Sequence, residues 1–103
     1  MELTVFERLI LLNILPREGN ITTIKIIRQL RDELSFTEEE HAALQFKSEE
    51  DGRVLWRKEA DKPKNVNIGV KAHGVIADRL KELDKQKKLT EQHLSVWDKF
   101  NEE

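Results

Sequence analysis

The chain has 103 residues, of which 37% are charged and 38% hydrophobic, and its net charge is −2. This length predicts one domain over residues 1–103, with a single core beneath a densely charged surface. The lack of cysteine excludes disulfides, thiolate metal sites and a cysteine nucleophile, and it fits an intracellular protein. The longest apolar stretch, Leu9 to Leu15, is too short to cross a bilayer, and the first residues lack the basic segment of a signal peptide.

The first helix is expected to begin at Thr4, because Thr4 and Glu7 have the spacing of a capping box. Pro16 should end this helix, since its ring lacks an amide hydrogen. We assign one face of the helix to the core of the protein, made of Phe6, Leu9, Ile10 and Asn13. Three further leucines lie partly on other faces: Leu11, Leu12 and Leu15. A symmetric homodimer would cover them, so they are predicted as partner-binding residues.

Two more helices are expected before the middle of the chain. Asn20 can cap a helix from Ile21 to about Leu34, with an inward stripe of Ile24, Ile27, Leu30 and Leu34. A third helix should follow Thr37, which forms a capping-box pattern with Glu40. Its inward residues are expected to be Ala43, Leu44 and Phe46, and Gly52 is available for a left-handed turn after it.

A β-hairpin is predicted next. Residues 54–57 and 66–70 alternate between apolar and other side chains, and the connection "ADKPK" contains a proline where it removes no ladder bond. The apolar face of this hairpin would consist of Val54, Trp56, Val66, Ile68 and Val70. A hairpin of two strands needs a helical layer to cover such a face.

Two helices complete the chain, one from about residue 72 to 87 and one, capped by Thr90, from residue 91 to about 100. The anchors of the last helix are expected to be Leu94, Trp97 and Phe100. The order of three helices, a β-hairpin and two helices predicts a mostly helical α+β fold with a winged-helix-like layout.

The second part of the chain resembles known proteins in its pattern. The runs "FTEEEHAALQF", "VLWRKE", "VNIGV" and "LTEQHLSVWDKF" are similar to small uncharacterised proteins of bacteriophages and prophages, from Phe36 onward. The resemblance implies an intracellular protein encoded by a phage. It implies no activity, and no site residues follow from it.

In a winged-helix layout the third helix is the usual DNA reader, but its first turn here is Glu38-Glu39-Glu40. These carboxylates would be repelled by the phosphates of DNA, so we expect this helix to pack as a capped structural element. The predicted hairpin is the better candidate for nucleic acid, because six bases lie in or beside it: Arg53, Arg57, Lys58, Lys62, Lys64 and Lys71. The alternative is that these charges only keep an edge strand from aggregating.

No pattern in the sequence predicts a reaction. His41, His73 and His93 lie on separate elements, no serine lies in a nucleophile elbow, and there is no glycine-rich phosphate loop. We therefore expect no metal, no cofactor and no catalysis. The favoured hypothesis is a cytoplasmic interaction or adaptor domain that forms a homodimer, with Trp97 and Phe100 as further partner-binding anchors. The alternative is a nucleic-acid-binding protein that uses the basic hairpin.

Overall fold

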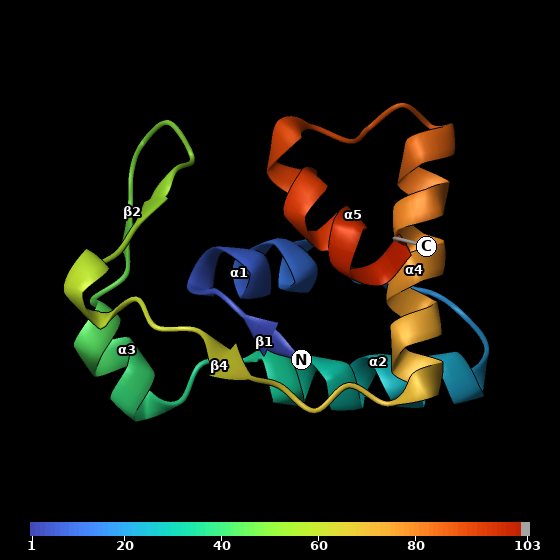
Figure 1. The fold of residues 1–103 in the computed structure, drawn as a ribbon, viewed down its shortest axis with the longest axis horizontal. Coiled ribbons are helices and arrows are strands. Elements are labelled where there is room, and N and C mark those ends of the chain that lie inside the picture. The colour runs from blue at the N-terminus through green and yellow to red at the C-terminus, as the bar shows by residue number, and fades with distance from the viewer. Residues whose placement is uncertain (102–103) are drawn as a thin grey trace.

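The computed structural model describes residues 1–101 (Figure 1). Its α-helices are α1 (Val5–Ile14), α2 (Ile21–Leu34), α3 (Glu38–Leu44), α4 (Val70–Lys85) and α5 (Leu94–Asn101). Its strands are β1 (Glu2–Leu3), β2 (Lys47–Ser48), β3 (Val54–Leu55) and β4 (Lys64–Asn65). Two short 3₁₀ helices are η1 (Lys58–Ala60) and η2 (Glu91–His93). The predicted fold class, mostly helical α+β, is confirmed.

The predicted starts of the first three helices are confirmed by their caps, whereas α4 begins at Val70 and α5 at Leu94, after the 3₁₀ helix η2. Thr4 and Thr37 each form a complete capping box, with Glu7 and Glu40 as the reciprocal partners. The side chain of Asn20 accepts a hydrogen bond from the first turn of α2, and α2 has the predicted bounds. These local hydrogen bonds join residues three apart in sequence, which is why the pattern alone located them.

Helices α1, α2, α4 and α5 form what we call the body, in which α4 lies against both α2 and α5 (Figure 1). The core of the body includes residues from both ends of the chain, such as Leu3 and Phe100. The inward stripe predicted for α2 is confirmed, since Ile27, Leu30 and Leu34 are buried.

The predicted inward face of α1 is wrong at Phe6 and Asn13, which are exposed, whereas Leu9 and Ile10 are partly buried and Ile10 packs against the core. Leu11, which was placed outside that face, is fully buried, and Leu15 is 4% exposed. The cause is that α1 contacts α2, α4 and α5. A helix with neighbours on several sides buries residues on more than one face, whereas a helix at an edge buries a single stripe. Leu12 is partly buried and packs against the same core. The three leucines predicted as a dimer surface are therefore core residues or lie beside the core.

The predicted pairing of strands is also wrong. Strand β3 pairs antiparallel with β2, so that Lys47 lies opposite Leu55, and β4 pairs antiparallel with β1. Residues 54–55 find a nearer partner across the turn that contains Gly52, whose φ of 90° is left-handed. Gly52 has the predicted conformation but serves the hairpin, while Gln45 ends α3 with a φ of 49°.

The alternation of residues 66–70 has another cause than a strand. Val66 is buried and its amide donates to the carbonyl of Met1, but Val70 is the first residue of α4 and is 91% exposed. In an extended segment, alternate side chains can pack against the core without any strand pairing, and the sequence then shows the same period of two residues as a strand. The predicted face that joined Val54 and Trp56 to these residues does not exist.

Residues 36–61, which contain α3, the β2–β3 hairpin and η1, stand to one side of the body, and we call them the arm (Figure 1). The arm has its own small aromatic cluster, in which the ring of Phe46 lies 5.0 Å from Phe36, 5.6 Å from His41 and 6.2 Å from Trp56. Trp56 also donates from its ring nitrogen to Asp61 at 2.9 Å. In α3, Leu44 is buried as predicted, but Ala43 is exposed.

Candidate functional site

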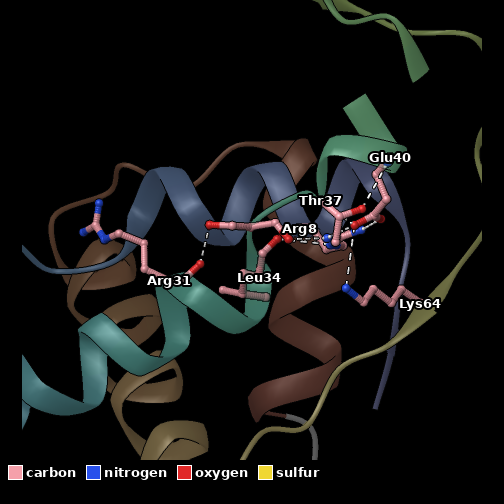
Figure 2. A network of polar contacts seen from close by, with 7 residues as sticks. Arg8, Arg31, Leu34, Thr37, Glu40 and Lys64 are labelled. Carbon is pink, nitrogen blue, oxygen red and sulfur yellow. Dashed lines mark hydrogen bonds and ion pairs between the residues drawn. The ribbon is translucent and has the colours of Figure 1, made fainter. Parts of the chain in front are cut away.

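A buried arginine joins the arm to the body. Arg8 of α1 is fully buried, and its guanidinium donates to the carbonyl oxygens of Leu34 (3.1 Å) and Ser35 (2.7 Å) at the end of α2. The same guanidinium donates to both carboxylate oxygens of Glu40 in α3, at 2.5 and 3.1 Å (Figure 2). The ring of Phe36 covers it at 3.9 Å. All these contacts satisfy a charge that would otherwise be costly to bury.

Glu40 connects several members of this network. It forms the capping box of α3, accepts from Arg8, and lies 3.6 Å from the ammonium group of Lys64 (Figure 2). The hydrogen bond from Arg8 is the main cause that lowers the pKa of Glu40 from its usual 4.5 to about 2. The carboxylate is therefore ionised at neutral pH and cannot act as a general acid there.

A second buried charge lies one residue before Arg8. Glu7 is 3% exposed, and it accepts from the hydroxyl of Ser95 and from the ammonium group of Lys99 at 2.7 Å, both on α5. Burial raises the pKa of Glu7, but the hydrogen bonds from Lys99, Ser95 and the Thr4 backbone outweigh it, so the net shift is downward. A buried acid was not expected from the sequence.

The Glu7 cluster contains the types of residue that serve in hydrolases, but its geometry does not activate a nucleophile. Ser95 donates its proton to a carboxylate with a lowered pKa, which is a weak base. The ammonium group of Lys99 donates to the same carboxylate and to the carbonyl oxygen of Glu2, so it is engaged as a hydrogen-bond donor and not placed as a base for Ser95. We interpret the cluster as a connection between α1 and α5.

The predicted phosphate-binding residues do not form one free basic surface. Arg53 pairs with Asp51 at 2.7 Å, Arg57 with Glu59 at 3.5 Å, and Lys64 with Glu40. The ammonium group of Lys58 lies 4.3 Å from the centre of the Trp56 ring. The remaining two are separate: Lys62 precedes β4, and Lys71 lies in the first turn of α4. The structure therefore disperses the six residues over several elements.

The histidines contribute to local packing. His93 accepts from the Thr90 amide at 2.9 Å and so caps η2, while His41 belongs to the aromatic cluster of the arm. The ring of His73 lies 4.9 Å from that of Phe100. Among residues 1–101, no group of three potential ligands is placed to hold a metal ion.

The residues predicted to bind a partner through the last helix have different positions. Phe100 is 4% exposed and belongs to the core, so its assignment as an anchor is wrong. Trp97 is only partly buried and lines a hollow of about 300 Å³ where α4 turns into α5. Leu94, at the start of the same helix, is 61% exposed and lines the same hollow. Leu89, His93, Thr90 and Asp84 complete its wall.

The burial of Glu7 and Arg8 was not predicted from the sequence. The signal for Arg8 was its position, because it lies three residues before Leu11 and seven before Leu15, on one face of α1. When the buried stripe of a helix is known, a charged residue at a position of that stripe is expected to be buried and to need a partner of opposite charge. For Glu7, the role in the capping box gave no indication of burial.

Compared with models of protein families, with curated proteins and with solved structures, the chain has no significant match. Within the part of the chain that the structure describes, no helix combines the length and the apolar composition needed to cross a membrane.

Proposed function

We propose that this protein is an interaction module that acts by protein–protein contact, without catalysis, and that its partner is a second copy of the chain. The observation that carries this proposal is the apolar hollow between α4 and α5, beside which an exposed leucine stands. The resemblance to phage and prophage proteins supports a module encoded by a phage and acting in the cytoplasm of the host cell.

A second copy is favoured because the same surface offers an exposed apolar side chain and a recess. In a twofold dimer each surface patch meets its own copy, so it must be complementary to itself. Leu94 is 61% exposed on the wall of the hollow that Leu89 and Trp97 also line. Leu94 of each copy would fill the hollow of the other, which removes apolar surface from water on both sides.

The charges around the hollow also suit a symmetric contact. Asp84 lies on its wall, and Lys87 and Lys88 follow in the turn after α4. A twofold axis that places Leu94 of one copy in the hollow of the other would also bring the acidic groups of one copy near the basic groups of the other. Charges of both signs at the rim of an interface contribute orientation more than affinity.

Nucleic-acid binding through the basic hairpin is the less supported alternative. Three of the six predicted residues, namely Arg53, Arg57 and Lys64, already form ion pairs within the chain. A fourth, Lys58, lies against Trp56. Phosphate contacts would have to compete with these partners.

The test is the mass in solution of the full chain, measured by light scattering over a wide concentration range, for the parent and for Leu94→Asp. We expect a dimer for the parent and a folded monomer for the variant, because a buried unpaired carboxylate opposes association. The matched control is Leu55→Asp, which places the same charge at an exposed leucine of the arm and should remain a dimer. A parent that stays monomeric throughout would contradict the proposal, as would a dimer that survives Leu94→Asp.

A further inference from the structure

Three arginines line one shallow hollow on the body, between the connection that precedes α2 and the side of α2 itself. Arg17 comes from the connection before α2, and Arg28 and Arg31 come from successive turns of α2. The hollow has a volume of about 300 Å³, and its apolar wall consists of Pro16, Ile24 and Ile27. Side chains from two segments therefore converge on one place.

The three guanidinium groups have no acidic partner within the part of the chain that the structure describes, since none of the ion pairs there involves them. This contrasts with Arg8, Arg53, Arg57 and Arg79, each of which has a carboxylate partner. In Figure 2 the side chain of Arg31 extends away from the Arg8–Glu40 network. Arg28 and Arg31 are both exposed and lie on one side of their helix.

The charge that lines the hollow is positive, although the whole protein carries a net charge of −2. Between Arg17 and Arg31 there are four bases and one acid, Glu18, and the next two residues of α2, Asp32 and Glu33, are acids that do not line the hollow. The first turn of α2 contains no acidic residue, so its positive helix end is not neutralised there either. Guanidinium groups grouped in this way without partners favour an anion with several acceptor oxygens.

We propose that Arg17, Arg28 and Arg31 bind the phosphate group of a nucleotide, either free or within a single strand of nucleic acid. The guanidinium groups would donate to the phosphate oxygens, and the sugar or base would lie on Pro16 and Ile24, which are partly exposed in the hollow. Guanidinium groups beside an apolar surface suit a nucleotide better than they suit inorganic phosphate, because inorganic phosphate has no apolar part to contact that surface. The site is independent of the proposed dimer surface, which involves α4 and α5.

The experiment measures binding of a fluorescent oligothymidine of about twelve nucleotides to the full chain, by anisotropy at about 50 mM salt. We expect binding that weakens as salt rises, with a logarithmic slope of about −0.7 for each phosphate that the arginines neutralise. The double variant Arg28→Gln/Arg31→Gln should lose at least about tenfold in affinity and show a flatter slope than the parent. Circular dichroism verifies that it is folded.

Two controls assign the effect to this hollow. Lys25→Gln removes an exposed charge from the same helix but not from the hollow, and should change the affinity less than about threefold. Arg53→Gln/Lys62→Gln removes two of the bases predicted from the sequence and should also have little effect. Thymidine monophosphate and inorganic phosphate, used as competitors, distinguish the sources of phosphate. Displacement by the mononucleotide supports a free nucleotide, and displacement only by unlabelled strand supports a nucleic acid.

Several results would overturn the proposal. One is the absence of binding at about 50 mM salt, and another is an unchanged affinity in the Arg28→Gln/Arg31→Gln variant. An equal loss in Arg53→Gln/Lys62→Gln would move the site to the arm. Equal displacement by a glutamate-rich peptide of the same charge would show that the hollow recognises acidic protein segments instead of phosphate. Equal displacement by inorganic phosphate would remove the role of Pro16 and Ile24.

Discussion

The body and the arm of this protein are held together by different interactions. In the body, apolar side chains from α1, α2, α4 and α5 share one core that includes Leu3 and Phe100. The arm buries little apolar surface of its own, and its ordered contacts are an aromatic cluster and a two-residue strand ladder. Its connection to the body depends on Arg8, which is fully buried and bonded to Glu40. The position of the arm therefore depends on a few directional contacts, whereas the body is held together by packing.

The largest expected effect comes from breaking the connection between the two regions. Glu40→Gln should lower the free energy of unfolding by about 3–5 kcal/mol, because it leaves Arg8 buried without an anionic partner. Urea denaturation followed by circular dichroism measures this change.

The matched control is Glu39→Gln, which removes the neighbouring exposed carboxylate in the first turn of the same helix. It should change the free energy of unfolding by less than about 0.5 kcal/mol. Similar values for the two variants would mean that the Arg8–Glu40 pair has no special part in stability.

Acid should weaken the same connection. The pKa of Glu40 is lowered in the folded protein to about 2 from its usual 4.5, so the stabilisation it provides is complete above pH 5 and is lost as the pH falls toward 2. We expect this carboxyl to contribute about 1–3 kcal/mol of the loss, a range that allows for its partial exposure to solvent.

The measurement is a series of urea denaturation curves between pH 6 and pH 2.5. Glu40→Gln should lose stability less steeply over this range than the parent does, because it lacks the group that titrates. Parallel pH profiles for the two proteins would exclude Glu40 as the source of the acid sensitivity. Glu7, whose pKa is also lowered, should continue to contribute in both proteins.

The smallest effect on overall stability is expected within the arm. Trp56→Ala removes the contacts with Phe46 and Asp61 and should speed amide hydrogen exchange through residues 45–61, while exchange in α4 stays nearly unchanged. Hydrogen exchange detected by mass spectrometry resolves the two regions. Val54→Ala, at an exposed position of the same hairpin, is the control and should leave both patterns as they were. Equal acceleration in α4 would show that arm and body unfold as one unit.

The interactions between near neighbours in sequence were predictable. The capping boxes at Thr4 and Thr37, the Asn20 cap and the bounds of α2 follow from hydrogen bonds and periodicity within a few residues, which the sequence displays directly. The exposed first turn of α3 is likewise a local property. These features do not depend on which other segments come near.

The tertiary structure decided every question that needs a partner segment. It determined that β3 pairs with β2 and β4 with β1, since alternation defines a surface but not what the surface meets. It determined that Leu11 and Leu15 face the core, because α1 is enclosed by three helices rather than one. It also brought Arg8 to Glu40, thirty-two residues later, and Glu7 to Lys99 at the other end of the chain. Long-range contacts of this kind depend on the sum of all packing in the body, and no short stretch of sequence contains that sum.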